Sequence, residues 1–564
     1  MNDREKKFIP DEDVYLFNTG SARKAGLCFG CRYIPELGAH RFVVWAPNAQ
    51  RVSLVGDFNS WDRAATPMEY IDGGVWVCFV EGLSDVLYKF CVTGADGHEI
   101  LKSDPFAAWS EHGENTASRV WKGGSYKWTD ESYMSRRAAR DFMREPMSIY
   151  ELHPGSWREL SGKKPAYREL ADSLAVYCKH MGFTHVELMP ITEYPYDGSW
   201  GYQVTGYYAP TSRYGNPDDF KYLVDKLHHT GIGVIMDWVP AHFPKDEHGL
   251  ANFDGTPLFE CKERRMAEHP EWGTLVFDYA SDQVQSFLVS SACKFFEEYH
   301  IDGIRVDAVS SMLYLDYGRR PGEFTPNRNG GNINLDAVAF LQKLNSTVLV
   351  NYPGAVTIAE ESTAFPKISA PPEDGGLGFC FKWDMGFMHD TLDYMSMDPL
   401  YRSHHHDKLT FSMMYAFSEN YVLAYSHDEV VHCKKSMIGK MFGDYDQKFS
   451  SLRALYGYQF AHPGKKLIFM GGEFGQFIEW NWRQGLDWLL LDYPRHEQLR
   501  QYYRALNRIY TANPAMYGRD HGWDGFKWLN VDDRERSSVA FMRMEPDAEK
   551  GAYLVCACNF TPVR

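Results

Sequence analysis

Residues 233–242 have the sequence Gly-Val-Ile-Met-Asp-Trp-Val-Pro-Ala-His, in which a short apolar run ends in polar side chains. Similar runs recur along residues 145–512, where they alternate with longer segments of helical hydrophobic period. The predicted strands cover residues 148–152, 185–189, 233–237, 303–307, 355–360, 378–383, 421–426 and 466–471. Helices are predicted between most of them, over residues 167–181, 218–230, 282–299 and 336–351. Strands that alternate with helices in this way are typical of a (β/α)8 barrel of the TIM type.

The barrel is one part of a predicted multidomain chain. Residues 38–125 contain short strand-like segments between turn residues, which favours an N-terminal β-sandwich. Residues 1–37 are predicted to be an irregular or helical lead-in, and residues 126–512 are assigned to the barrel. Residues 513–564 return to short strands, and three strands are too few for a closed domain. We therefore expect an all-β C-terminal domain that is truncated in this sequence, and a natural chain that continues.

An open, doubly wound sheet is the structural alternative to the barrel. It is disfavoured because no Gly-x-Gly-x-x-Gly motif follows the first predicted strand.

Composition excludes several classes of partner. The net charge of −16 would repel a polyanion, so we expect no binding of nucleic acid. No apolar run approaches the ~18 residues of a membrane helix, and the charged N-terminus does not resemble a signal peptide. The 11 cysteines are an odd number without metal-type spacing, which favours a reducing, cytoplasmic location. We expect a monomer that needs no cofactor and no metal.

Acidic side chains follow four of the predicted barrel strands. Active sites of such barrels lie at the C-terminal ends of the strands. The polar residues at these ends are Asp237, His242, Arg305, Asp307, Glu360, Glu361, His427 and Asp428. A single aspartate after a strand is ordinarily a helix cap or a turn former. Four strands that end in acids are harder to explain in this way, because crowded like charges cost free energy.

These residues suit the cleavage of a glycosidic bond, which requires one protonated and one ionised carboxyl group. Arg305 is a fixed cation near Asp307 and would favour the ionised form of that residue. Glu360 would be the acid, because nearby negative charge and partial desolvation would raise its pKa. At a separation of about 5–5.5 Å, the ionised group attacks the sugar and forms a covalent glycosyl-enzyme. Asp428 could stabilise the positive charge of the transition state. Only one of Glu360 and Glu361 can face the pocket, because adjacent side chains of an extended chain point to opposite sides.

These segments resemble the four short motifs of the α-amylase family of glycoside hydrolases, in the same order. The matching segments are residues 237–242 (Asp-Trp-Val-Pro-Ala-His), 303–308 (Gly-Ile-Arg-Val-Asp-Ala), 359–363 (Ala-Glu-Glu-Ser-Thr) and 426–429 (Ser-His-Asp-Glu). The resemblance implies that Asp307 is the nucleophile, Glu360 the general acid/base and Asp428 the stabiliser of the transition state. It also implies that the attacked glucose is bound by Tyr202, Asp237, His242, Arg305 and His427, with Tyr202 as a stacking platform.

Within that family, the chain resembles the branching enzymes most. The segments that carry this resemblance are residues 149–157 (Ile-Tyr-Glu-Leu-His-Pro-Gly-Ser-Trp), 200–203 (Trp-Gly-Tyr-Gln), 359–363 (Ala-Glu-Glu-Ser-Thr), 426–432 (Ser-His-Asp-Glu-Val-Val-His) and 469–476 (Phe-Met-Gly-Gly-Glu-Phe-Gly-Gln). Residues 41–121 resemble the starch-binding sandwich that precedes such barrels. The implied reaction is a retaining double displacement that cleaves an α-1,4-glucan (glycogen, amylose or amylopectin) and transfers the segment to a 6-hydroxyl, which creates an α-1,6 branch.

Two other functions remain open on the sequence. A glucan hydrolase of the debranching or trehalose-releasing type would share this architecture, and no single residue proves that an acceptor chain wins over water. A non-catalytic glucan-binding scaffold is the alternative of another class, although its acids would then have no use.

Three positions depart from the family pattern. Val204 stands where branching enzymes usually have proline, and Cys433 stands where they usually have glycine. Ala241 replaces the asparagine that helps to hold calcium in amylases. Calcium prefers several oxygen ligands and alanine offers no side-chain oxygen, so we expect no calcium at this place.

Overall fold

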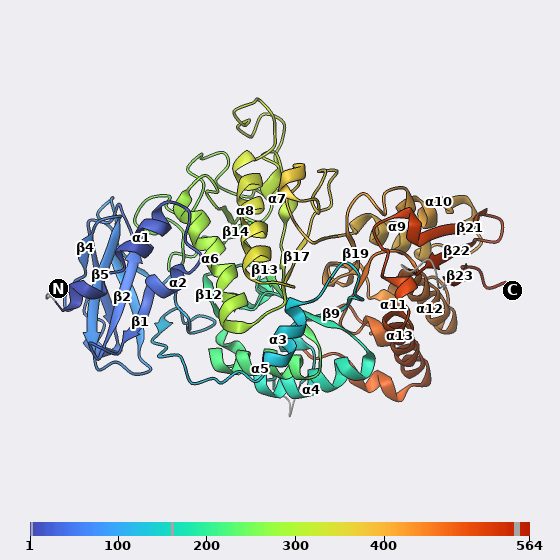
Figure 1. Cartoon of the computed structure of the whole chain (residues 1–564), viewed down its shortest axis with the longest axis horizontal. Helices are drawn as coiled ribbons and strands as arrows, with labels where there is room; N and C mark the ends of the chain where they lie inside the picture. Colours follow the sequence, from blue (N-terminus) through green and yellow to red (C-terminus); the bar gives the residue numbers. More distant parts are fainter. Residues whose placement is uncertain (2–3, 160–162, 546–552, 564) are drawn as a thin grey trace. The chain divides into compact units, whose positions relative to one another are not determined.

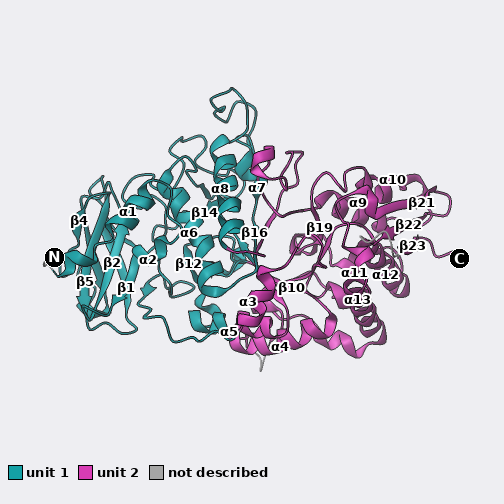
Figure 2. Ribbon diagram, viewed as in Figure 1, with its two compact units in different colours: residues 1–129, 190–222, 236–351 teal, residues 130–189, 223–235, 352–564 magenta. Residues whose placement is uncertain are grey.

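The computed structural model describes residues 1, 4–159, 163–545 and 553–563. It contains an N-terminal pair of antiparallel sheets, a closed barrel and a C-terminal antiparallel sheet (Figure 1). The chain divides into two compact units (Figure 2). Unit 1 comprises residues 1–129, 190–222 and 236–351, and unit 2 comprises residues 130–189, 223–235 and 352–564. Both units contribute strands to the barrel.

The N-terminal sheets of unit 1 form the predicted sandwich. One sheet has the order β1 (Gly30–Ile34), β2 (Ala39–Trp45), β5 (Val75–Glu81), β4 (Glu69–Ile71). The other has the order β3 (Arg51–Gly56), β6 (Leu87–Thr93), β7 (Glu99–Lys102), and β8 (Ser118–Arg119) also pairs with β6. Phe42 of β2 and Tyr88 of β6 are fully buried, with ring centroids 5.0 Å apart. The two sheets therefore share one apolar core.

The lead-in is helical at α1 (Asp11–Asn18) and α2 (Ala25–Cys28), but the prediction for it misses β1. This strand is stabilised by its pairing with β2, a contact that the pattern of its own residues does not reveal. The two helices pack on α6 (Asp282–Tyr299). There, Ser286 Oγ donates to the Phe17 carbonyl at 2.9 Å and Ser290 Oγ donates to the Ala22 carbonyl at 3.1 Å. The lead-in thus links the sandwich to a barrel helix.

The barrel closes through eight parallel strands in a single cyclic order, which confirms the predicted fold class. That order is β9 (Ser148–Leu152), β10 (His185–Leu188), β13 (Gly233–Trp238), β16 (Gly303–Val306), β17 (Val356–Ala359), β18 (Phe381–Trp383), β19 (Tyr421–Tyr425) and β20 (Lys465–Phe469). Every residue of β9, β13 and β17 is buried, as expected for strands that are covered on both faces. The long helices of the barrel region are α4 (Tyr167–Met181), α5 (Pro217–His229), α6, α8 (Leu335–Asn351), α12 (Tyr445–Ala461) and α13 (Pro494–Ala512).

Strand β18 is shorter than predicted, since residues 378–380 lie outside it. Gly378 has a φ of 80°, which an extended strand does not allow, and its backbone N–H donates to the Ala370 carbonyl at 2.9 Å. A turn therefore occupies the start of the predicted strand. No helix in the described part of the chain combines the length and apolar character needed to cross a bilayer.

The C-terminal sheet of unit 2 contains β21 (Phe526–Asp533), β22 (Ser538–Met544) and β23 (Tyr553–Asn559). Buried charges attach it to the barrel strand β20. Arg543 of β22 donates to the Ala461 carbonyl at 2.9 Å and to Asp520 Oδ1 at 2.5 Å. Lys465 Nζ of β20 lies 3.7 Å from Asp520. Burial raises the pKa of Asp520, but Arg543 and the two lysines Lys465 and Lys466 outweigh it, so the pKa falls below its usual value.

We expect Asp520→Ala to destabilise unit 2, because it leaves Arg543 and Lys465 buried without their counter-ion. The expected loss is about 3–5 kcal/mol in the free energy of unfolding, measured by urea titration at neutral pH. Asp524→Ala is the matched control, since Asp524 pairs with Arg519 at 3.3 Å on the surface and is 66% exposed; it should cost at most about 1 kcal/mol. Equal effects of the two variants would contradict the structural role of the buried cluster.

Candidate active site

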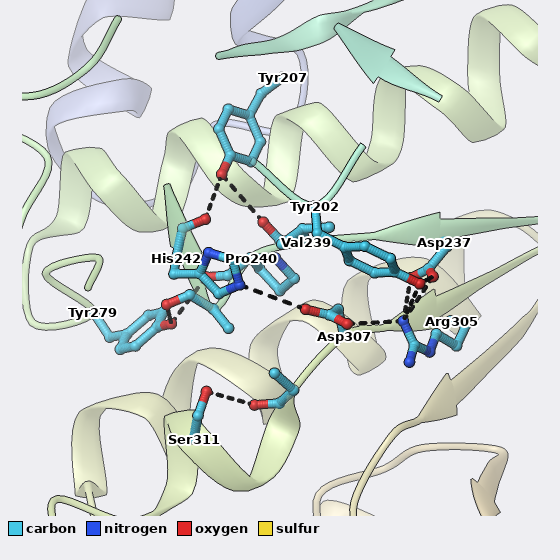
Figure 3. A network of polar contacts seen from close by, with 12 residues as sticks. Tyr202, Tyr207, Asp237, Val239, Pro240, His242, Tyr279, Arg305, Asp307 and Ser311 are labelled. Carbon is cyan, nitrogen blue, oxygen red and sulfur yellow. Dashed lines mark hydrogen bonds and ion pairs between the residues drawn. The ribbon is translucent and has the colours of Figure 1, made fainter. Parts of the chain in front are cut away.

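One guanidinium joins two carboxylates at the ends of barrel strands in unit 1 (Figure 3). Arg305 Nη1 donates to both oxygens of Asp237 at 2.7 Å and to Asp307 Oδ1 at 2.9 Å. Arg305 lies in β16 and Asp307 two residues further, so their side chains point to the same side of the extended chain. Asp237 and Arg305 are 1% exposed and Asp307 is 7% exposed. The three side chains together carry one net negative charge in a site from which most water is excluded.

Tyr202 completes this network. Its hydroxyl donates to Asp237 Oδ2 at 2.6 Å, and its ring centroid lies 5.9 Å from the Arg305 guanidinium carbon (Figure 3). The predicted site residues Tyr202, Asp237, Arg305 and Asp307 are therefore brought together. Both oxygens of Asp237 already accept hydrogen bonds, so this carboxylate holds Arg305 and Tyr202 in position.

His242 lies on the other side of Asp307. Its Nε2 is 3.8 Å from Asp307 Oδ2, a distance compatible with an ion pair if the ring were charged. Burial, and after it the nearby His269, lowers the pKa of His242 to about 3, so the ring is neutral at pH 7. The contact is therefore between a neutral imidazole and a carboxylate.

Two buried tyrosines fix the backbone that carries His242 (Figure 3). The Tyr207 hydroxyl donates to the carbonyls of Val239 and His242 at 3.2 and 3.0 Å. The Tyr279 hydroxyl donates to the carbonyls of residues 240 and 241 at 2.9 and 3.3 Å. Buried carbonyl groups need such donors, and here the donors hold the loop after β13 in one conformation.

The structure distinguishes the two adjacent glutamates after β17 in unit 2. Glu361 is fully buried, and its Oε2 lies 2.6 Å from Lys382 Nζ of β18. Its Oε1 accepts the Thr363 backbone N–H at 2.8 Å and also the Thr363 hydroxyl. Glu360, by contrast, is half-buried. Glu361 is thus held in the ion pair with Lys382, and Glu360 is the one of the two glutamates that solvent can reach.

His427 and Asp428 follow β19 in unit 2. Glu151 of β9, 1% exposed, accepts the His427 backbone N–H at 3.0 Å and lies 2.5 Å from His427 Nδ1. An ionised carboxylate only accepts, so Nδ1 carries the proton. The other ring nitrogen, Nε2, then lies 3.4 Å from Asp428 Oδ1, and the Asp428 side chain is 38% exposed. Glu151 therefore fixes both the tautomer and the orientation of the predicted sugar-binding histidine.

Val204 and Cys433, the two departures from the pattern of the branching enzymes, have different surroundings. Val204 is 1% exposed and belongs to the apolar core. Cys433 is exposed and has a φ of 66°, in the left-handed region that favours glycine. Glu479 stabilises this loop, because its carboxylate accepts the backbone N–H groups of Cys433 at 3.1 Å and Lys435 at 2.6 Å.

Several residues of the site were not predicted. Glu151 lies in the quoted segment 149–157, where nothing marks it as the partner of a histidine 276 residues further along the chain. Tyr207 and Tyr279 act through their hydroxyl groups on backbone carbonyls, which no side-chain pattern reveals. Trp272 lies in a turn that matches no motif, and its ring centroid is 5.0 Å from that of His242. Within the described ranges, no group of three or more His, Cys, Asp or Glu side chains is arranged to hold a metal ion.

Comparison with known proteins adds two family matches. Residues 28–107 match carbohydrate-binding module 48, the isoamylase N-terminal domain, and residues 170–254 match the α-amylase catalytic domain. The 1,4-alpha-glucan branching enzyme GlgB of Aquifex aeolicus is 53% identical over 569 residues, which cover 99% of this chain and 89% of that protein. GlgB of Halothermothrix orenii is 51% identical over 99% of this chain and 89% of its own length.

Among solved structures, the fold is similar to a pullulanase mutant from Paenibacillus barengoltzii complexed with maltotetraose. The TM-score is 0.68 at 18% identity, and the match covers 95% of this chain and 88% of the pullulanase chain. At this identity the likeness concerns the fold alone.

We expect Glu361→Ala to lower stability and Glu360→Ala to remove activity. Loss of Glu361 leaves Lys382, whose side chain is 8% exposed, as a buried unpaired cation; the free energy of unfolding should fall by about 3–5 kcal/mol. Glu360→Ala should change it by less than about 1 kcal/mol and remove activity on α-glucan. Urea unfolding and an iodine-staining assay measure the two effects. An active Glu360→Ala variant would contradict this assignment of the two glutamates.

Proposed function

The chain belongs to the family of 1,4-α-glucan branching enzymes, and from this premise we propose how its residues carry the reaction. The enzyme cleaves an α-1,4-linked glucan and transfers the segment to a 6-hydroxyl group, which creates an α-1,6 branch. The observation that supports our assignment most is the hydrogen-bonded group of Arg305, Asp237 and Asp307.

In the first step, Asp307 Oδ2 attacks the anomeric carbon while Glu360 donates its proton to the glycosidic oxygen. The bond from carbon to that oxygen breaks, and a covalent glycosyl-enzyme forms on Asp307. Arg305 favours the ionised form of Asp307 and fixes Oδ1 by a hydrogen bond of 2.9 Å. Oδ2, 3.8 Å from the neutral His242, is the oxygen that we assign to the attack.

In the second step, Glu360 takes the proton from the 6-hydroxyl of an acceptor chain. The acceptor oxygen bonds to the anomeric carbon and Asp307 leaves as a carboxylate, so the anomeric configuration is retained. Asp428 stabilises the oxocarbenium-like charge of both transition states. Tyr202 stacks on the attacked glucose, while His242 and His427 bind its hydroxyl groups.

We also propose the finer features of the enzyme. Glycogen, amylose and amylopectin are its α-glucan substrates, and the carbohydrate-binding match at residues 28–107 supports a polymeric glucan. The proposed domains are a lead-in (1–37), whose β1 adds a strand to the sandwich, the sandwich itself (38–125), a catalytic barrel (126–512) and a C-terminal β domain (513–564). The protein acts as a monomer in the cytoplasm, in agreement with a net charge of −16 and no disulfide among the described cysteines.

The reaction is tested with amylose as substrate. We expect the protein to lower iodine staining with little gain of reducing ends, because segments are transferred and not released to water. Asp307→Ala should lower the rate by at least about 1,000-fold, since it removes the nucleophile. Asp72→Ala is the control, because it makes the same substitution at an exposed position. A rise of reducing ends in step with the loss of staining would identify a hydrolase, and equal, near-zero rates of wild type and Asp307→Ala would identify a scaffold.

A second prediction concerns Glu151 as a positioning residue. Glutamine keeps its shape but replaces one acceptor oxygen by a donor, so it cannot accept from both Nδ1 and the backbone N–H of His427. We expect kcat/KM on amylose to fall about 10- to 100-fold in Glu151→Gln. The double variant Glu151→Gln/His427→Ala should be no worse than His427→Ala alone, because Glu151 acts through that histidine. Additive losses would contradict this role.

A further inference from the structure

A rigid turn places an exposed tryptophan beside the nucleophile in unit 1. The turn covers residues 269–274 and is closed by hydrogen bonds from His269 N to Thr274 O and from Gly273 N to His269 O, both 2.9 Å. It leads into β15 (Leu275–Val276), which pairs antiparallel with β14 (His242–Phe243). Since His242 faces Val276 in this pairing, the turn is an extension of the same two strands that carry the active-site histidine.

The indole of Trp272 lies at the tip of this turn and contacts three other rings. Its centroid is 5.0 Å from that of His242, 4.7 Å from that of His269 and 5.8 Å from that of Tyr317. His242 in turn lies 3.8 Å from Asp307 Oδ2. A single imidazole ring therefore separates the indole from the nucleophilic carboxylate.

The neighbouring loop that carries Tyr317 is fixed to the turn by Arg319. This guanidinium donates to the Glu268 carbonyl at 2.6 Å, next to the turn, and to the Tyr317 carbonyl at 3.2 Å on its own loop. It also donates to the Arg265 carbonyl at 3.2 Å. The backbone segments that carry the two aromatic rings are thus linked before any ligand arrives, which limits the entropy that binding would cost.

Trp272 remains 37% exposed although it packs against three rings. One exposed aromatic side chain is common on protein surfaces and means little by itself. Here, however, it lies one ring from a group of sugar-binding polar residues, and a pyranose has an apolar C–H face that packs on an aromatic ring. The exposed acids Glu268 and Glu271 flank it, so an anionic ligand would be repelled.

We infer that Trp272 and Tyr317 form a stacking platform for a glucosyl unit adjacent to the one that Asp307 attacks. This inference rests on the proposed function and names a further part of the same site. The platform binds a neutral α-1,4-glucan chain through its C–H faces and leaves the hydroxyl groups to the polar residues around Asp307. It contributes to the affinity for a long chain and takes no part in bond cleavage.

The test compares the kinetics of Trp272→Ala, Trp272→Tyr and wild type on amylose. We expect KM to rise about three- to tenfold in Trp272→Ala with kcat changed less than about twofold. Trp272→Tyr should restore most of the affinity, because it restores an aromatic face. Trp523→Ala is the matched control, since this tryptophan is 54% exposed and lies in unit 2, outside the described site.

Two results would overturn the inference. The first is an unchanged KM in Trp272→Ala. The second is a loss of kcat at unchanged KM that tyrosine does not restore, which would show that Trp272 only supports His242. Failure of the proposed function itself is recognised separately, because wild-type protein would then show no branching of amylose.

Discussion

The geometry of the candidate site in unit 1 depends on one buried cation. Arg305 is the group through which Asp237 and Asp307 can lie close together, since two carboxylates of this burial would otherwise repel each other strongly. Because Asp237 holds two contacts to the guanidinium and Asp307 holds one, Arg305 is fixed by the first and acts on the second. Asp307, the proposed nucleophile, is therefore oriented by a guanidinium that Asp237 holds in place.

Buried carboxylates also position neighbouring groups in unit 2. Glu151 positions His427 through the ring and the backbone together, and Lys382 retains Glu361 away from solvent. Both carboxylates are buried: Glu151 is paired with His427, and Glu361 is held by Lys382 and Thr363. Pre-organised groups of this kind cost no reorganisation when charge develops in a transition state. Glu360 and Asp428, the residues that we propose to react, are partly buried and adjoin these pairs in the sequence.

Much of the fold was predictable, because hydrophobic period defines the barrel strands and the bounds of α4 and α6 agree with it. β1 and the start of β18 were not, since one depends on pairing and the other on a glycine turn. For the site, the acids at strand ends were predictable from topology, whereas Glu151 and Trp272 depend on contacts between distant segments. The choice between Glu360 and Glu361 required the position of Lys382, which alternation along one strand cannot supply.

The hydroxyl groups of Tyr207 and Tyr279 donate to four successive carbonyl oxygens of the loop after β13. These hydrogen bonds do not involve the side chains of the loop residues. Such a loop can change its chemistry without changing its path. Evolution can therefore exchange Ala241 for another small residue at little cost, yet a single inserted or deleted residue would shift every carbonyl out of register with its tyrosine. At residues 239–241, the length of the segment is therefore a stronger constraint than the side chains that it carries.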